Sequence, residues 1–167
     1  MKLSDPDIRE VVEKATLSFA AMVCADGSPN LSPKGSMRVY DESHLAFMDI
    51  TSPGTMANLR RDPRMEITVI DVFRWRGYRF KGEAEILPVG HPVYEWLNDW
   101  LLEINGPGYP ANEAVLVTVH RVLPILSPAY TWGGATEKAL ASSWTARYLQ
   151  GMGLPVDGLP APAKQKG

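Results

Sequence analysis

The strict alternation of side chains between residues 78 and 86 constrains the fold of this chain more than any other feature. The small or apolar positions are Tyr78, Phe80, Gly82, Ala84 and Ile86, and the charged positions between them are Arg79, Lys81, Glu83 and Glu85. Successive side chains of a β-strand point to opposite faces, so this pattern predicts a strand with one buried face and one solvated face. Such a strand needs neighbouring strands to cover its apolar side.

Five further segments are short and rich in β-forming residues. They are residues 16–25, 31–40, 44–49, 65–72 and 115–121. The Asp26-Gly27 pair between the first two segments is typical of a hairpin turn, because both residues tolerate positive φ. We expect the last segment to be buried on both faces for most of its length. Six strands with short connections predict a mainly β, antiparallel barrel with peripheral helices rather than a parallel sheet.

Three helices are expected around these strands. The first starts at Pro6, with Asp5 as its cap and apolar residues at helical spacing. The second covers residues 55–61, with Thr55 as its cap. The third covers residues 93–104, where apolar side chains follow the spacing of one helix face.

Three of the five tryptophans invite a comparison between packing and ligand binding. Trp96 and Trp100 lie on the apolar stripe of the third expected helix, so we interpret them as core residues. Trp132 lies outside any periodic element, because the hydrophobic pattern weakens after Pro128. It is therefore the better candidate for reaching a ligand.

Length and composition indicate one domain. The chain has 167 residues, of which 45% are hydrophobic, enough for a single core. We assign residues 1–150 to this domain and expect residues 151–167, rich in Pro, Gly and Ala, to be a disordered or extended tail. The longest apolar run, residues 19–25, has seven residues, whereas a membrane span needs about 20. With no secretory signal at the N-terminus, we expect a cytoplasmic protein without a membrane partner.

Charge and motif content exclude several classes of function. The net charge is −2, from 17 Lys+Arg and 19 Asp+Glu, which argues against a nucleic-acid partner. Cys24 is the only cysteine, so no internal disulfide is expected, and a core thiol is its simplest interpretation. The three histidines lack metal-ligand spacing, and no metal site is expected. The dinucleotide, Walker and G-x-S-x-G motifs are absent from the sequence.

One candidate ligand segment is the run that follows the Asp26-Gly27 turn. It reads S-P-N-L-S-P-K-G-S-M-R over residues 28–38, so that Pro33 and Gly35 interrupt an expected strand. Central strands avoid both residues, and a glycine permits close approach of a ligand to the backbone. Lys34 between them would supply positive charge. The alternative interpretation is a bulged edge strand with a solvated lysine.

A second candidate segment reads T-S-P-G-T-M-A-N-L-R-R over residues 51–61. It places hydroxyl groups and backbone N–H groups at the start of a helix, and such an end attracts phosphate. The alternative interpretation is an ordinary capped turn followed by two exposed arginines. Each segment is weak evidence when it is taken alone.

In this order, the two segments resemble the FMN-binding split-barrel family that includes pyridoxamine 5'-phosphate oxidase. The matching stretches read ADGSPNLSPKGSMRVYDESHLAFMDITSPGTMANLRRDPRMEITV and RGYRFKGEAEIL, and the resemblance covers residues 17–128. It implies a six-stranded antiparallel split β-barrel of Greek-key-like topology. It also implies FMN as cofactor and a homodimer in which both chains line each flavin groove. Lys34 and residues 51–58 would come from one chain, and residues after Arg74 or in 130–134 from the other.

The resemblance also assigns roles to individual positions. The strand that borders the flavin ring would contain Asn30, Leu31, Ser32, Pro33, Lys34 and Gly35, and the phosphate turn would contain Thr51, Ser52, Thr55 and Asn58. Lys34 would stabilise negative charge on the reduced ring. Pro53 and Gly54 stand where family members often have a basic residue, so an arginine from elsewhere is expected to compensate: Arg38, Arg60, Arg74 or Arg76.

These assignments predict an FMN-dependent oxidoreductase whose small-molecule substrate or redox partner is unknown. The segment Trp132-Gly133-Gly134 is similar to the Trp-x-Gly-Gly of the oxidases, but the sequence then continues A-T-E-K in place of their Arg-x-His. Pyridoxamine-phosphate oxidation itself is therefore not expected, and no residue is assigned as a general acid or base. The alternatives are a non-catalytic flavin-binding or electron-transfer protein, or a barrel that binds a deazaflavin or haem.

Overall fold

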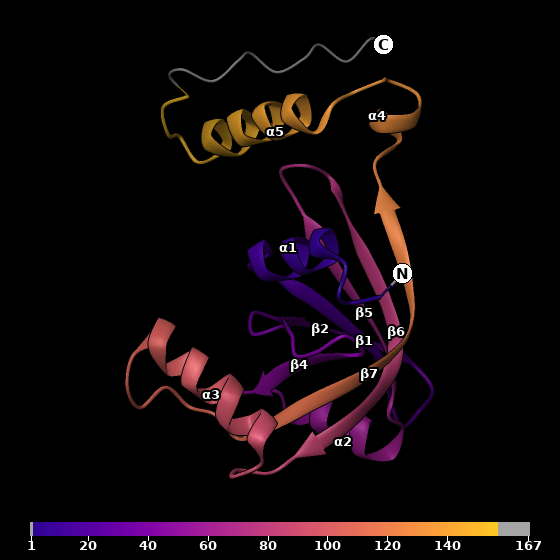
Figure 1. Ribbon diagram of the computed structural model, residues 1–167, viewed down its shortest axis with the longest axis vertical. Helices are drawn as coiled ribbons and strands as arrows, with labels where there is room; N and C mark the ends of the chain where they lie inside the picture. The colour runs from indigo at the N-terminus through magenta and orange to yellow at the C-terminus, as the bar shows by residue number, and fades with distance from the viewer. Residues whose placement is uncertain (1, 157–167) are drawn as a thin grey trace.

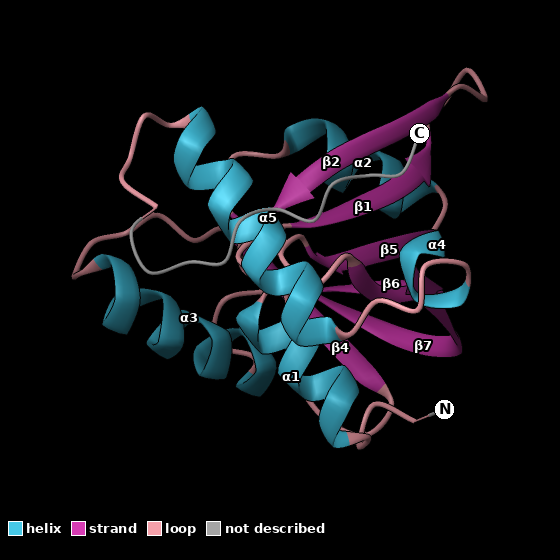
Figure 2. Ribbon diagram, turned by 90° about the horizontal axis from the view of Figure 1, so that it is seen from above, coloured by secondary structure: helices cyan, strands magenta, loops and turns pink. Residues whose placement is uncertain are grey.

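The computed structural model describes residues 2–156 and shows one seven-stranded, strongly curled sheet with helices around it (Figures 1 and 2). Its strands are β1 (Ser18–Val23), β2 (Pro29–Lys34), β3 (Arg38–Val39), β4 (His44–Asp49), β5 (Arg64–Asp71), β6 (Arg76–Leu87) and β7 (Glu113–Leu126). Neighbouring strands are antiparallel, in the order β2-β1-β5-β6-β7-β4-β3. The mainly β, antiparallel split-barrel architecture is confirmed.

The strand count differs by one, because residues 31–40 form two strands instead of one. β2 pairs with β1, whereas β3 pairs with β4 at the opposite edge of the sheet. The break follows Pro33, which has no N–H for a ladder, and Gly35, which bends easily. Residues 35–37 therefore connect the two edges of the sheet and draw them toward each other.

The alternation that predicts the β6 strand is confirmed. Tyr78 and Phe80 are buried while Arg79 is exposed. Gly82 lies at a register shift between β6 and β7, where an added Cβ would stand 2.2 Å from the carbonyl oxygen of Thr118. No larger side chain fits at this position without moving the backbone.

The expectation that the last strand is buried on both faces holds only for its first part. Ala114, Val115 and Val117 are buried, but from Thr118 onward the side chains of β7 are half-buried or exposed. The second half of this long strand runs toward α4 (Figure 1). Within it, Val119 and Val122 still pack against the core, while most other side chains are more exposed.

In residues 2–156, five helices surround the sheet. They are α1 (Pro6–Lys14), α2 (Pro53–Arg61), α3 (Pro92–Asn105), α4 (Pro128–Thr131) and α5 (Glu137–Gly151). Helix α1 starts as predicted, with the Asp5 carboxylate accepting the N–H of Asp7. Helix α2 starts two residues earlier than predicted, because Pro53 occupies its favoured first position. Ser52 is therefore the cap, and the assignment of Thr55 as the cap is wrong.

Helix α5 has no counterpart among the expected helices. Its sequence shows little apolar periodicity, and Ala146 is the one residue of the helix that is buried. The helix lies beside the tip of the β5–β6 hairpin (Figure 1). There the rings of Trp144 and Trp75 stack 4.1 Å apart. Contacts between aromatic side chains, together with ion pairs of Glu137, hold this helix in place of a continuous apolar stripe.

The apolar core has two parts. The larger part lies between the sheet and helices α1 and α2 and contains the fully buried Phe47 and Phe80. The smaller part joins α3 to β4 and β7 and contains Leu97. Trp96 and Trp100 pack against this second part, as the helical spacing predicts.

Two further expectations concern Cys24 and the tail. Cys24 is half-buried rather than a core thiol, because it follows the end of β1 and enters the hairpin turn. Of the expected tail, residues 157–167 lie outside the described residues, so that expectation stays a prediction. In the described part of the chain, no helix has the length and apolarity needed to cross a membrane.

Candidate functional site

The two candidate segments of the sequence meet at one hollow. Strand β2 and the turn between β4 and α2 form its walls, and its volume is about 430 Å³. The lining residues are Asn30, Leu31, Ser32, Pro33, Thr51, Ser52, Pro53, Gly54 and Thr55. The curl of the sheet brings these segments together, because β2 lies at one edge and the turn follows β4 near the other.

Alternation along β2 decides which of its residues face the interior. Leu31 and Pro33 are exposed, whereas Ser32 is half-buried and Lys34 is buried, with 4% of its surface exposed. Lys34 therefore extends beneath the hollow and is not the solvated lysine of an edge strand. Its ammonium group lies 5.6 Å from the centre of the Phe47 ring, close enough for a cation–π interaction.

Three hydroxyl groups surround the ammonium group of Lys34. Its Nζ donates to Ser32 Oγ at 2.9 Å and to Ser52 Oγ at 2.7 Å, and Thr55 Oγ1 lies at the long limit of 3.5 Å. A hydroxyl that accepts from an ammonium group still has its own proton to donate. The open side for these protons is the hollow, so its floor presents hydrogen-bond donors.

Burial and a buried carboxylate act in opposite directions on Lys34. Burial lowers the pKa of its ammonium group below the ordinary value of 10.5, and the opposite charge of Asp49 offsets part of this effect. The hydroxyl oxygens that accept from the ammonium group favour its charged form, as does the opposite charge of Asp49.

The start of helix α2 adds further donors. Ser52 is its N-cap, but its side chain makes no capping hydrogen bond, because its oxygen accepts from Lys34 instead. The first turn of a helix has backbone N–H groups without intrahelical partners, and its dipole favours anions. The helix end, the hydroxyl groups and the buried cation together offer the kind of hydrogen-bond donors and charge that an anionic group such as a phosphate binds.

The other predicted site residues occupy different places. Gly35 follows Lys34 at the break between β2 and β3. Asn58 lies one turn further along α2, outside the lining of the hollow, and its Nδ2 is 3.7 Å from the sulfur of Cys24. Trp132 ends α4 and is 90% exposed. Figure 1 places α4 at the far end of β7 from α2, so one chain does not bring Trp132 to the hollow.

The four arginines that were expected to compensate for Pro53 and Gly54 have other partners. Arg38 lies over the ring of Trp100 at 4.7 Å, and Arg60 pairs with Glu113. Neither is among the residues that line the hollow. The cation nearest to the hollow is instead Lys34, which lies beneath it.

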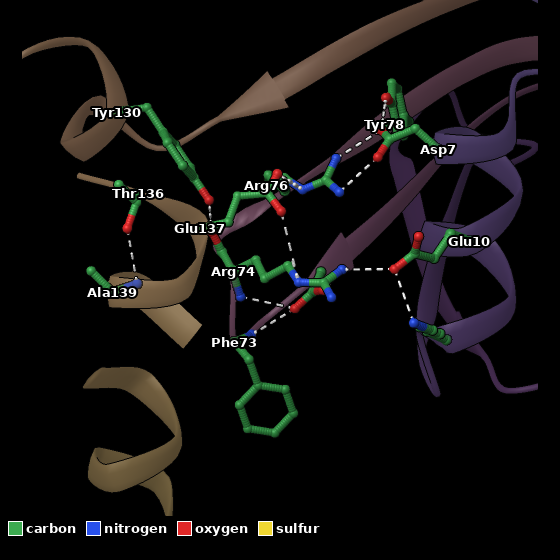
Figure 3. A network of polar contacts seen from close by, with 12 residues as sticks. Asp7, Glu10, Phe73, Arg74, Arg76, Tyr78, Tyr130, Thr136, Glu137 and Ala139 are labelled. Carbon is green, nitrogen blue, oxygen red and sulfur yellow. Dashed lines mark hydrogen bonds and ion pairs between the residues drawn. The ribbon is translucent and has the colours of Figure 1, made fainter. Parts of the chain in front are cut away.

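Arg74 and Arg76 belong to a network of ion pairs that joins α1, the β5–β6 hairpin and α5 (Figure 3). Two nitrogens of Arg76 donate to the Asp7 carboxylate at 2.7 Å each, and its Nε lies 2.8 Å from Glu137. Hydrogen bonds from Arg76 and then Tyr78 lower the pKa of Asp7 to about 2. Glu137, part of the segment that replaces Arg-x-His, therefore has a structural partner.

Two polar residues that support the site were not singled out from the sequence. Asp49, at the end of β4, is buried, and its Oδ1 accepts the backbone N–H of Ser52 at 3.0 Å. Asn112, just before β7, contacts the other carboxylate oxygen at 3.4 Å. Asp49 could have been found from the sequence, because it is a carboxylate that ends an otherwise apolar strand directly before a hydroxyl-rich turn.

Within residues 2–156, no group of three or more His, Cys, Asp or Glu side chains is arranged to hold a metal ion.

The curled antiparallel sheet has the split-barrel architecture, and Lys34 with its hydroxyl partners lies where the edges of that sheet approach each other. The chain belongs to the pyridoxamine 5'-phosphate oxidase family, whose model matches residues 4–125. Among solved structures, it is 30% identical to HupZ of Group A Streptococcus, with a TM-score of 0.64 over 72% of this chain and 93% of that one.

Two further solved structures share the fold at lower identity. An FMN-binding protein from Syntrophomonas wolfei is 15% identical, with a TM-score of 0.58 over 72% of this chain and 90% of that one. A protein described as F420 reductase is 23% identical, with a TM-score of 0.55 over 69% and 94%. No curated protein is detectably similar to the chain.

Proposed function

We propose that this protein binds FMN at the hollow between β2 and the turn of residues 51–55 and acts as an FMN-dependent oxidoreductase. The observation that carries the proposal is the buried Lys34, which joins hydroxyls of both segments beneath the hollow. Family membership supports a flavin as the ligand. The fold is shared with an FMN-binding protein and with an F420 reductase, so the choice of FMN is part of the proposal.

The phosphate of FMN fits the chemistry of the hollow floor. Ser32, Ser52 and Thr55 present hydroxyl protons, and the start of α2 presents backbone N–H groups. A phosphate has several oxygen acceptors, and fixed donors recognise it better than a mobile surface charge does. Lys34 would act from beneath these donors, so we propose a role for it at the phosphate in place of the role at the reduced ring that the resemblance implies.

The flavin ring would lie along β2. This strand is at the edge of the sheet and pairs with β1 on one side only, so its other edge has backbone groups free to bond a ligand. Leu31 is 64% exposed, and it lines the hollow beside Pro33, giving an apolar surface for the ring. A bound flavin supplies hydride or electron transfer.

The same lining favours a second candidate, a flavin-binding or electron-transfer protein without an organic substrate. None of the nine residues that line the hollow has a carboxyl, imidazole, thiol or amino side chain. The chain therefore adds no general acid or base within the hollow itself. Turnover of a reduced nicotinamide or an organic substrate would favour the enzyme, and electron exchange alone would favour the carrier.

We further propose that the protein is a homodimer with the flavin between the chains. The outward-facing positions of β1 and β2 form one apolar surface. They are Phe19, Ala21, Val23, Pro29, Leu31 and Pro33. An exposed apolar patch of this kind is typical of an interface, and Leu31 and Pro33 also line the hollow. A second copy on this surface would cover the hollow and could supply Trp132 to it.

The test of the proposal is ligand binding by the purified protein. We expect a flavin absorbance spectrum, with FMN identified by mass spectrometry, or binding of added FMN at micromolar concentration and weaker binding of riboflavin, which lacks the phosphate. Recovery of a deazaflavin or haem instead would identify one of the alternative cofactors. Failure to bind FMN at micromolar concentration would remove the proposal. The cytoplasmic location expected from the sequence stays a prediction, to be tested by cell fractionation.

A further inference from the structure

Asp49 is a buried carboxylate that contacts both the candidate site and the segment just before β7. It is 6% exposed and ends β4, directly before the hydroxyl-rich turn. Its Oδ1 accepts the N–H of Ser52 at 3.0 Å, and its Oδ2 lies 3.4 Å from Nδ2 of Asn112. Burying a carboxylate is costly unless hydrogen bonds and an opposite charge compensate. A residue held at this cost is a candidate for a functional role.

The hydrogen bond to Ser52 determines what the Ser52 side chain does. An N-cap serine normally turns its oxygen toward the N–H groups of the first helical turn. Here Asp49 holds the backbone of Ser52, and the Ser52 oxygen accepts from Lys34 at 2.7 Å, with no capping bond. The first turn of α2 is thereby left without a side-chain partner and open to a ligand.

Asn112 fixes the carboxylate from the segment just before β7. Its backbone N–H donates to the Asp49 carbonyl oxygen at 2.9 Å, and its Nδ2 donates to the Ile50 carbonyl oxygen at 2.8 Å. The end of β4 is therefore tied to the segment just before β7 at three points. The carboxylate has little freedom to turn away from Ser52.

The charge of Asp49 balances that of Lys34. Lys34 gives its protons to neutral hydroxyls, and the Asp49 carboxylate is the opposite charge that acts on it through space. Together the two buried groups have no net charge. An anion in the hollow would then be recognised by donors in fixed directions more than by a net positive field.

We propose that Asp49 is a positioning residue for phosphate recognition, which orients Ser52 and balances the charge of Lys34, so that the hollow selects a phosphate monoester by directed hydrogen bonds. This inference rests on the proposed FMN site and assigns Asp49 no contact with the ligand. Two properties follow from it. Phosphate recognition depends weakly on salt, and it requires the Asp49 oxygen that accepts from Ser52.

The experiment compares the affinities of FMN and riboflavin for the wild-type protein, Asp49→Asn and Asp49→Ala. Riboflavin reports on the ring site and on the folded state, so the ratio of the two affinities isolates the phosphate contribution. We expect Asp49→Ala to reduce this ratio about tenfold, which corresponds to about 1.4 kcal/mol. Asp49→Asn keeps an acceptor for Ser52 and is expected to retain most of the ratio at low salt.

Salt and pH then separate the two parts of the role. In Asp49→Asn the charge of Lys34 is no longer balanced, so FMN affinity should fall more steeply with added KCl than in the wild type. As the pH is raised, this variant should also lose its preference for FMN at a lower pH than the wild type does. The reason is that Lys34 no longer has the opposite charge that favours its protonated form. The matched control is Asp41→Asn, since Asp41 accepts backbone N–H groups in the turn before β4. It should behave as the wild type does.

The outcomes that would overturn the inference are distinct from those that would overturn the proposed function. Equal weakening of FMN and riboflavin in both variants would make Asp49 a purely structural residue. Unchanged affinity ratios and salt dependence would remove its role altogether. If the wild type itself does not prefer FMN to riboflavin, the proposed phosphate site is refuted, and this inference, which depends on it, is refuted as well.

Discussion

Replacing Lys34 by Met is the sharpest test of the site. The substitution keeps a long side chain in the apolar surroundings beside Phe47 and removes the ammonium group. Ser32 and Ser52 each lose a short hydrogen bond, of 2.9 and 2.7 Å. Their hydroxyls are then free to turn, and the donors beneath the hollow lose their fixed direction.

The expected loss follows from the two phosphate hydrogen bonds whose donors, the Ser32 and Ser52 hydroxyls, lose their fixed direction. Each such bond contributes about 0.5–1.5 kcal/mol net, and Thr55, whose contact with Lys34 is already long at 3.5 Å, adds little. The sum of about 1–3 kcal/mol corresponds to a roughly 5- to 150-fold weaker binding of FMN. Riboflavin, which places no phosphate on these donors, should bind Lys34→Met within about twofold of the wild type.

Quenching of flavin fluorescence during titration at pH 7 measures both affinities. The matched control is Lys81→Met, because Lys81 is exposed on the outer face of β6 and pairs with Glu66. Its FMN affinity should not change. If Lys34→Met binds FMN as tightly as the wild type, or loses FMN and riboflavin equally, Lys34 does not act on the phosphate. As the pH is raised, the wild type should lose its preference for FMN before the pH reaches the ordinary lysine pKa of 10.5, because burial lowers the pKa of Lys34.

Three further predictions concern stability and assembly. The pKa of Asp7 is about 2 in the folded state against an ordinary 3.8, so its contribution is present above pH 4 and is lost as the pH falls from about 4 to 2. After allowance for solvent screening of this partly exposed carboxylate it amounts to about 1–2 kcal/mol, and urea unfolding of Asp7→Asn should show a smaller loss of stability over that pH range. Gly82→Ala should destabilise the fold by more than about 2 kcal/mol, because the new Cβ would stand 2.2 Å from a backbone oxygen of β7, whereas Gly54→Ala, with no atom within 4 Å, should melt normally. If the flavin lies between two chains, dilution should dissociate the dimer, as measured by light scattering, and release the flavin at the same time. Trp132→Ala should weaken FMN binding or shift flavin fluorescence. A monomer that retains FMN would contradict the shared site.

Local features of the sequence determined the strands, the turns and the content of the site. Alternation between residues 78 and 86 is a property of neighbouring side chains, and so is the hairpin signal of Asp26-Gly27, so each could be interpreted without knowing the fold. The two segments that line the hollow could also be singled out locally, but each left an ordinary structural alternative open, and their expected roles came from the family resemblance. Helix α5 escaped prediction because its few anchoring side chains have no period.

The tertiary structure decided how these parts act together. Period-two alternation places Ser32 and Lys34 on one face of β2, but only the curl of the sheet determines that this face points inward, beneath a turn 18 residues away from Lys34. The role of Asp49 likewise depends on a strand that ends beside that turn and on Asn112, 63 residues later. Contacts between distant segments have no local signature, because they arise when the edges of the sheet meet and a buried charge must find its partners there.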